Sequence, residues 1–248
     1  MAVMAEPRRI LLAGVSGGIG TAISQQLAGR FPEAQLLSIS RSAEPPAGLP
    51  VAEHLRADLT EPDSVPAARE FLADRGAPPD WVICCCGILH GGGGGRGPEK
   101  ALNQCEDRWL LESMRINVIT HLHLAQALAP LLQRHCPLVW ASLSAKVGSI
   151  GDNHLGGWYS YRMSKAALNM LVRNLSIEWG RRLERCCVVA IHPGTTDTGL
   201  SKPFQKNIAA DKLYSAATSA RRIVDVLANL DEARSGRLLF WDGEVLPW

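Results

Sequence analysis

The chain has 248 residues, of which 46% are hydrophobic and 20% charged, and its formal net charge is +2. This length suits one α/β domain with a sizeable core, and the near balance of charge argues against a strongly basic surface for nucleic acid. No stretch approaches the ~18 consecutive apolar residues that a membrane span needs, and residues 1–7 have no signal-peptide pattern. We therefore expect a single domain over residues 1–248, located in the cytoplasm and without a nucleic-acid or membrane partner.

Short apolar runs alternate with helix-like segments along the chain. Strands are expected near residues 9–13, 35–40, 53–57, 81–85, 137–143, 186–191 and 236–241. Helices are expected near residues 18–30, 63–74, 103–133, 159–180 and 213–230. Such alternation implies a parallel sheet with right-handed crossovers. The glycine-rich stretch 90–98 and the Pro- and Ala-rich stretch 43–50 are predicted loops.

A glycine-rich turn follows the first expected strand and leads into a helix. Gly14, Gly18 and Gly20 stand in the pattern Gly-x-x-x-Gly-x-Gly. A helix N-terminus offers unpaired N–H groups and a positive dipole end, and glycine lets the backbone approach phosphates closely. We interpret the turn as a pyrophosphate site, and the alternative is a purely structural turn.

The end of the second expected strand bears on the choice between NAD and NADP. An acidic residue there would bond the ribose hydroxyl of NAD. This chain has Ser40 followed by Arg41, so no carboxylate repels a 2′-phosphate and a guanidinium can bind it. The pattern favours NADP, with NAD as the alternative if Arg41 merely faces solvent.

Tyr161 and Lys165 lie four residues apart in a segment that reads as helix. Residues at this spacing project from one helical face, so a phenol and an ammonium are held side by side. A nearby cation favours the phenolate, which lowers the pKa of a tyrosine and suits it to proton transfer. The alternative is an amphipathic surface pair.

The seven cysteines include two runs, Cys84 to Cys86 and Cys186 to Cys187, in apolar, strand-like stretches. We expect buried free thiols in a reducing compartment. No Cys-x-x-Cys or His-x-x-x-His spacing is present, so no metal site is predicted. His121 and His123 are two apart on an expected helix, which favours solvent or packing roles.

Together these motifs resemble the short-chain dehydrogenase/reductase family over nearly the whole chain, and most of all its C-factor and sniffer-type carbonyl reductases. The family implies a Rossmann-type doubly wound α/β fold, with a mainly seven-stranded parallel sheet and helices on both faces. The segments that carry the closer likeness are Gly148 to Asn153, Gly156 to Tyr161 and Leu200 to Phe204.

The resemblance also implies roles for residues outside these motifs. Asp58 looks like the acidic residue that meets the adenine ring, Asn117 like the active-site Asn, and Thr198 like the threonine on the nicotinamide side. The expected catalytic residues are Tyr161, Lys165, Ser144 and Asn117. The expected cofactor-binding residues are Gly14, Ser16, Gly18, Ile19, Gly20, Arg41, Asp58, Leu59, Gly87, Tyr161, Lys165, Pro193, Gly194, Thr196 and Thr198.

The chain departs from the family pattern at two places. The family's Asn-Asn-Ala-Gly stretch is Cys84-Cys85-Cys86-Gly87, which affects packing beside the central sheet. The catalytic serine falls at Ala145 in a gap-free alignment and at Ser144 after a one-residue shift. We expect Ser144, because it alternates with apolar Leu143 at the end of the strand. The alternatives are Ser142 and the absence of any serine hydroxyl.

The function that these features predict is hydride transfer between a nicotinamide and a carbonyl or alcohol. Tyr161 would be the general acid in reduction, Ser144 would donate a hydrogen bond to the substrate oxygen, and Lys165 would hold the ribose. By resemblance, Asn117 would hold a water that links Lys165 to solvent. The alternative is a catalytically weak nucleotide-binding protein in signalling or regulation, of the C-factor type.

The substrate-side residues after the Pro-Gly turn are apolar. Leu200, Phe204 and Ile208 recur at fours and predict a lid helix, with Trp158 and Leu155 as the opposite wall. These residues favour a small lipophilic ketone or aldehyde, and the alternative is that they belong to the core.

The expected helices at 103–133 and 159–180 carry apolar residues beyond a single stripe, which predicts burial against another subunit. We expect a homodimer or homotetramer, and the family's dimers use these same two helices. The residues concerned are Leu110, Leu111, Ile119, Leu122, Leu168, Met170, Leu171 and Leu175.

Overall fold

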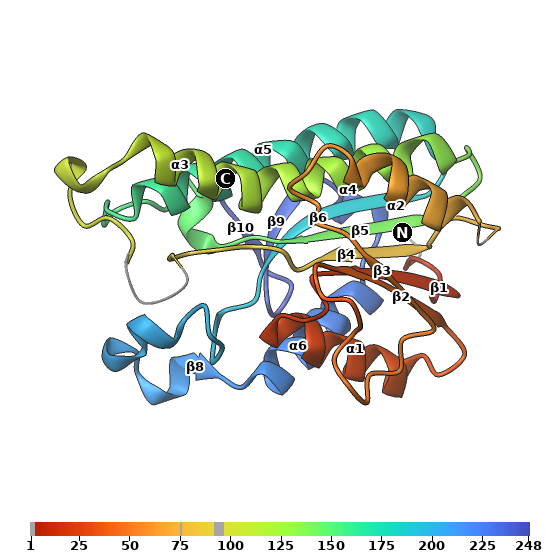
Figure 1. Cartoon of the computed structure of the whole chain (residues 1–248), viewed down its shortest axis with the longest axis horizontal. Helices are drawn as coiled ribbons and strands as arrows, with labels where there is room; N and C mark the ends of the chain where they lie inside the picture. Colours follow the sequence, from red (N-terminus) through yellow and green to blue (C-terminus); the bar gives the residue numbers. More distant parts are fainter. Residues whose placement is uncertain (1–2, 75, 92–96) are drawn as a thin grey trace.

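The computed structural model describes residues 3–74, 76–91 and 97–248, so residues 92–96 of the predicted glycine-rich loop lie outside it. Its centre is an eight-stranded sheet in the order β10-β9-β6-β5-β4-β1-β2-β3 (Figure 1). Every neighbouring pair is parallel except β9 and β10. The strands are β1 Arg9–Ala13, β2 Gln35–Ser40, β3 Glu53–Arg56, β4 Trp81–Cys84, β5 Leu138–Leu143, β6 Cys186–His192, β9 Arg237–Phe240 and β10 Val245–Leu246.

The seven predicted strands are confirmed, and the eighth, β10, is the addition. It has two residues, too few to carry an alternation of apolar and polar side chains. The central strands β4 and β5 are buried at every position, as parallel strands covered on both faces must be. Successive residues enter opposite cores, since Leu11 and Leu12 belong to different apolar clusters.

Helices cover both faces of the sheet (Figure 1). On one face α1 (Gly18–Arg30) packs against α6 (Ala216–Ala228). The other face carries α2 (Ser64–Ala73), α3 (Asp107–Met114), α4 (Thr120–Leu128) and α5 (Tyr159–Arg182). Trp140 of β5 and Trp179 of α5 meet edge to face at 5.4 Å in that core. This is the doubly wound arrangement that the sequence predicts.

The helix predicted at 103–133 is divided into shorter elements. It begins at Asp107, passes through a π-helical turn at Arg115–Ile119, and ends in a 3₁₀ turn at Ala129–Leu131. Pro130 in that last turn lacks the N–H that a continuing helix needs. The side chain of Asn117, in the π turn, hydrogen-bonds to both backbone groups of Ile88, a contact that the local sequence does not reveal.

The helix predicted at 213–230 starts later, at Ala216. Leu213–Tyr214 form β8, which pairs in parallel with β7 (Thr195–Thr196) in a separate two-stranded sheet. The hydroxyl of Ser215 then caps α6 by accepting a hydrogen bond from Thr218 N at 3.1 Å. The predicted loop at 43–50 is confirmed, and no helix in the described ranges is both long and apolar enough to cross a membrane.

Candidate active site

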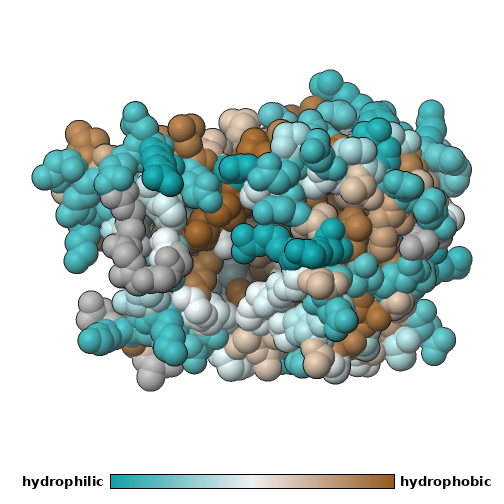
Figure 2. Space-filling view, viewed as in Figure 1, coloured by the Kyte–Doolittle hydropathy of each residue, from teal (hydrophilic) through white to brown (hydrophobic). Residues whose placement is uncertain are grey.

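A cleft of about 300 Å³ lies between the turns that follow β1, β2, β3 and β4. Six predicted cofactor-binding residues line it, namely Gly14, Ser16, Arg41, Asp58, Leu59 and Gly87. A larger cavity of about 550 Å³ lies beside α6 and the turn after β9, and none of the predicted site residues lines it. The face in Figure 2 is hollowed near its middle, between the helices above the sheet and the segment that carries β8.

The glycine turn packs tightly enough to exclude side chains. Gly14 has a φ of +80°, which favours glycine, and a Cβ on Gly20 would lie 2.2 Å from the carbonyl oxygen of Gly14. A Cβ on Gly18 would lie 2.8 Å from Cγ2 of Thr198, so the start of α1 meets the segment after the Pro-Gly turn. Since α1 has no side-chain cap, its first backbone N–H groups suit phosphate oxygens.

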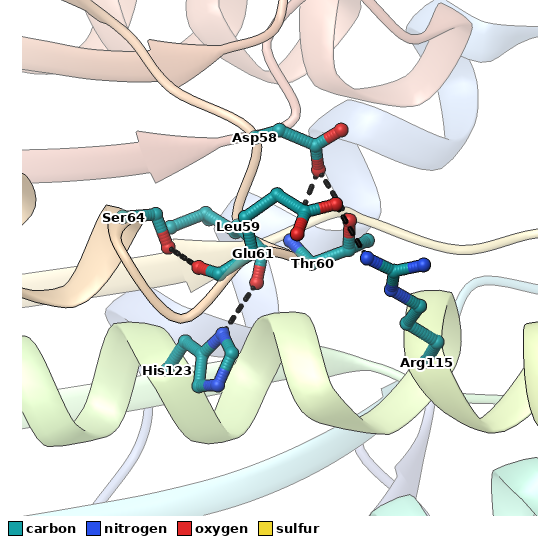
Figure 3. Close-up of polar contacts among 7 residues, drawn as sticks. All are labelled: Asp58, Leu59, Thr60, Glu61, Ser64, Arg115 and His123. Carbon is teal, nitrogen blue, oxygen red and sulfur yellow. Dashed lines mark hydrogen bonds and ion pairs between the residues drawn. The ribbon is translucent and has the colours of Figure 1, made fainter.

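The loop after β3 is held to α4 and to the π turn by polar contacts (Figure 3). Leu59 O accepts a hydrogen bond from His123 Nδ1 at 2.9 Å, and Glu61 forms an ion pair with Arg115. Ser64 Oγ donates to Glu61 O at 2.6 Å. These contacts hold one wall of the cleft against α4 and the π turn.

Asp58 is the ionised group of that wall. Burial acts to raise the pKa of Asp58, but the hydrogen bonds from Thr60 and the charges of Arg41 and Arg115 together lower it. Thr60 donates from its N–H at 3.0 Å and from its hydroxyl at 2.8 Å. The carboxylate is therefore charged at neutral pH and oriented toward the cleft region that Arg41 also lines.

The end of β2 is hydrogen-bonded to His54, a residue that the sequence analysis does not single out. Its Nδ1 lies 2.7 Å from Ser38 Oγ, and its Nε2 lies 3.1 Å from Ser42 O. The imidazole thus links the side chain of Ser38 to the backbone of Ser42, on either side of Ser40 and Arg41. A histidine in a short edge strand carries no signal of this role in sequence, because its partners lie 16 and 12 residues away.

Tyr161, Lys165 and Asn117 come together where α5 passes the ends of β4 and β5. A Cβ on Gly87 would lie 3.2 Å from Asn117 Oδ1 and 3.3 Å from Lys165 Nζ, so both polar groups converge there. Lys165 Nζ donates to Leu143 O at 2.8 Å and lies 5.9 Å from the centroid of the Tyr161 ring. The spacing-based prediction of a shared face is confirmed.

The pKa values of this pair differ from the sequence expectation. Burial raises the pKa of Tyr161 above its ordinary value of 10.0, whereas the sequence predicts that Lys165 lowers it. Burial also lowers the pKa of Lys165 to about 8, although the nearby cysteines Cys84, Cys86 and Cys85 oppose this shift. At neutral pH the structure therefore holds a protonated phenol beside a cation.

Asn117 is fully buried and its hydrogen bonds join three segments. Its Oδ1 accepts from Ile88 N at 2.7 Å, and its Nδ2 donates to Ile88 O and to Ser164 Oγ, both at 2.9 Å. The π turn, the loop after β4 and the first turns of α5 are thereby locked together.

The hydroxyls of Ser142 and Ser144 are both engaged away from Tyr161. Ser144 Oγ donates to Asn169 Oδ1 at 2.6 Å. Ser142 Oγ lies between Trp140 Nε1 at 2.9 Å and His121 Nδ1 at 3.0 Å. Ala145 instead packs in one apolar cluster with Leu89 and Tyr161. The position that the gap-free alignment assigns to the catalytic serine thus presents a methyl group.

His121 belongs to that buried network, as its predicted packing role requires. Its Nε2 donates to Cys86 O at 3.2 Å, so its Nδ1 accepts from the Ser142 hydroxyl. Burial, together with the Lys165 charge, lowers the pKa of His121 to about 3. A neutral imidazole under the site is therefore part of the fold at physiological pH.

Aromatic side chains form the wall next to Tyr161. The Trp158 ring centroid lies 6.3 Å from that of Tyr161 and 5.4 Å from that of Phe204. Trp158 has a φ of 51°, a left-handed conformation that no other non-glycine residue in the described ranges adopts. Leu155 is 92% exposed, so its predicted place in this wall is wrong.

Glu99 is a buried residue that sequence reasoning missed. Its carboxylate accepts hydrogen bonds from Ser160 N at 3.3 Å and from the Ser160 hydroxyl, and its backbone carbonyl accepts from Trp158 N at 2.5 Å. A carboxylate at a helix N-terminus is favoured by the dipole. Glu99 therefore fixes the first turn of α5 through Ser160, the residue before Tyr161.

The remaining predicted cofactor residues surround the Pro-Gly turn and the start of α1. Gly194, after Pro193, has a φ of +76°, and a Cβ there would lie 2.9 Å from the Tyr214 ring. The Thr196 hydroxyl hydrogen-bonds to Ser219 Oγ at 2.7 Å. Ile19 packs against the core between the sheet and α1. In the described ranges no three His, Cys, Asp or Glu side chains gather as a metal site.

Relatives in sequence cover most of the chain. A family model described as "Enoyl-(Acyl carrier protein) reductase" matches residues 14–229. The 1-hydroxy-2-glutathionyl-2-methyl-3-butene dehydrogenase of Rhodococcus sp. (strain AD45) is 29% identical over 240 residues, which are 96% of this chain and 99% of that protein. The C-signal protein of Myxococcus xanthus is 32% identical over 148 residues, 60% of this chain and 84% of its own length.

Solved structures show the same architecture. The NADPH-bound carbonyl reductase from chicken fatty liver is similar with a TM-score of 0.83 and 25% identity, over 99% of this chain and 96% of that one. The carbonyl reductase Sniffer of D. melanogaster has a TM-score of 0.80 and 24% identity, over 98% and 100%, which shows the common fold. The chain belongs to the short-chain dehydrogenase/reductase family.

Proposed function

We propose that this protein is an NADP-dependent oxidoreductase that reduces small lipophilic ketones or aldehydes to alcohols. The observation that carries the proposal is the convergence of Tyr161, Lys165 and Asn117 beside a cleft whose far end holds Arg41. The bound nicotinamide would supply the hydride, and the chain supplies binding, orientation and the proton.

The choice of NADP over NAD rests on the end of β2. Arg41 lines the cleft and the residue before it is a serine, so a 2′-phosphate would meet a cation and no carboxylate. The backbone at the start of α1 would hold the pyrophosphate, and Asp58 would meet the adenine. The chicken relative with bound NADPH supports the same assignment.

The protonated state of Tyr161 suits the reductive direction of the reaction. Because burial keeps the phenol protonated at neutral pH, Tyr161 can give a proton to a carbonyl oxygen, which is the step that reduction requires. Lys165 Nζ lies 5.9 Å from the centroid of the Tyr161 ring, and Asn117 lies near Lys165 beside Gly87. They would carry the replacement proton and hold the nicotinamide ribose.

The substrate oxygen would be polarised by Tyr161 without help from a serine. Ser144 and Ser142 are bonded elsewhere, and Ala145 contacts the Tyr161 cluster. The wall formed by Trp158 and Phe204 adds apolar surface. A lipophilic carbonyl compound fits these surroundings better than a polyhydroxylated one, since hydroxyl groups would lose hydrogen bonds there.

A role in signalling is the second candidate, favoured by the likeness to C-signal of M. xanthus. Nucleotide binding alone requires neither a titratable phenol nor a buried ammonium. Lys165 is 3% exposed, and burying a charge is costly, so a protein that only binds a nucleotide gains nothing from this residue. We therefore place the oxidoreductase first.

We further propose that α5 forms a subunit interface. Met163, Met170 and Ile177 recur at sevens along α5 and are exposed, as is Leu111 of α3. Two of the residues expected on this surface, Leu168 and Leu175, are instead in the core. The exposed stripe supports a homodimer, with a homotetramer as the larger form.

Tyr161→Phe should abolish reduction while leaving the fold and cofactor binding intact, because it removes only the proton donor. The expected loss in kcat is about 10²–10⁴-fold, measured as NADPH oxidation over a panel of ketones, aldehydes and quinones. Near-normal turnover in the variant would remove Tyr161 as the proton donor, whereas no turnover in the native protein despite tight NADPH binding would favour the signalling role.

Ser144→Ala should change turnover by less than about threefold but lower stability by about 1–3 kcal/mol, because Asn169 loses its buried partner. Ala145→Ser places a hydroxyl beside Tyr161 and should raise kcat, since one well-placed donor is worth about 10²-fold in other enzymes. Kinetics and thermal unfolding of both variants check this. A large loss of kcat in Ser144→Ala with unchanged stability would restore Ser144 as the polarising residue.

Arg41→Asp should weaken NADP binding far more than NAD binding, because the new carboxylate repels the 2′-phosphate and can bond the ribose hydroxyl. Calorimetric titration with both nucleotides measures the change. Arg69→Asp, an equal charge change on the exposed face of α2, is the control and should leave the preference as it is. An unchanged NADP preference in Arg41→Asp would remove Arg41 from the phosphate site.

Met170→Glu should shift the protein toward monomer, because it places a charge in the centre of the exposed apolar stripe. Light scattering at micromolar concentration measures the mass of the native protein and of the variant. Gln25→Glu on α1, on the other side of the sheet, is the matched control. A monomeric native protein would refute the interface.

A further inference from the structure

Cys86 is a thiol in the cofactor cleft that the reaction does not use. It follows β4 and lines the cleft together with Arg41 and Asp58, and its side chain is partly exposed. A Cβ on Gly14 would lie 3.2 Å from Cys86 Sγ. The sulfur therefore rests against the glycine turn, within the space that a bound nucleotide would share.

The surroundings of Cys86 favour its thiolate. A hydrogen bond from Cys84 lowers the pKa of the Cys86 thiol, and the charges of Arg41 and Lys165 lower it further. Burial and the charge of Asp58 oppose these effects, and the net shift is downward. The other cysteines with a resolved shift move the opposite way, since burial raises the pKa of Cys84, Cys85, Cys105, Cys186 and Cys187.

Cys86 is thus both accessible from the cleft and lowered in the pKa of its thiol. Cys84 is fully buried in the sheet, so it can donate to Cys86 but cannot meet a reagent from solvent. Cys85 is partly exposed and also lines the cleft, but burial raises the pKa of its thiol. Cys105 and Cys136 are partly exposed and lie outside the cleft. Reactivity of a cysteine follows its thiolate fraction and its exposure together, and Cys86 combines both.

We propose that Cys86 is an oxidative modification site, at which hydrogen peroxide converts the thiolate to a sulfenic acid that hinders nucleotide binding. The sulfur attacks the peroxide, an S–O bond forms and the O–O bond breaks. The sulfur is oxidised by two electrons, and the departing hydroxide takes a proton to become water. A thiol reductant reverses the change by forming a disulfide that a second thiol cleaves.

The added oxygen would act on the cleft in two ways. It lengthens the side chain at a point where the glycine turn already lies close to the sulfur, and it adds a polar group to the cleft that Arg41 also lines. A bound nucleotide would cover the same sulfur, so occupancy and oxidation would exclude each other. This last consequence rests on the proposed function, whereas the reactivity of Cys86 does not.

The test uses the full chain, graded hydrogen peroxide and a sulfenic-acid trap, with peptide mass spectrometry of all seven cysteines. Cys86 should be trapped at least tenfold faster than Cys105 or Cys136, and NADP⁺ at saturation should slow the trapping of Cys86 but not that of Cys105 or Cys136. Trapping of Cys86 no faster than these two controls would overturn the proposal. Rapid trapping that NADP⁺ fails to slow, in a sample where calorimetry shows NADP⁺ bound, would overturn the mutual exclusion.

Matched variants separate the site from general oxidative damage. Peroxide should weaken NADP⁺ binding by the native protein and by Cys105→Ala, and dithiothreitol should restore it, whereas binding by Cys86→Ala should not respond to peroxide. Equal sensitivity of Cys86→Ala would refute the role of this thiol. If calorimetry shows no NADP⁺ binding to the untreated native protein, the cofactor assignment fails, and the trapping rates still decide the reactivity of Cys86.

Discussion

The burial of one ammonium group organises the centre of this molecule. Lys165 is 3% exposed, and its Nζ is bonded to Leu143 O at the end of β5. Taking that charge out of water is costly, so the surrounding atoms must be placed to accept it. The last residue of β5 supplies the oxygen, the turn after β4 supplies space at Gly87, and Asn117 lies beside it. The ends of β4 and β5, the π turn and α5 are therefore held together by the contacts around Lys165.

Much of this fold could be predicted from sequence because its signals are local. The apolar runs of β4 and β5 are continuous since both faces of the sheet are covered, and the spacing of Tyr161 and Lys165 specifies a shared helical face on its own. The glycine turn could be predicted in the same way, because its strand, turn and helix follow one another directly in the chain.

What could not be predicted depends on partners distant in sequence. Glu99 meets Ser160 across 61 residues, and Asn117 meets Ile88 across 29. The direction of a hydroxyl is likewise invisible in sequence, since alternation places Ser144 on a face but Asn169 decides where its oxygen points. The shift in the pKa of Tyr161 was expected with the wrong sign, because burial outweighs the charge of Lys165.

The π-helical turn at Arg115–Ile119 has a consequence for how this chain tolerates change in length. A π turn is equivalent to one residue inserted into an α-helix, so every side chain after it is rotated by about 100° relative to an uninterrupted helix. His121 and His123 reach their partners only with that rotation. Deletion of a single residue here would restore a regular α-helix. Both imidazoles would then rotate away from their hydrogen-bond partners, and the contacts that join the helix to the sheet and to the wall of the cleft would be lost.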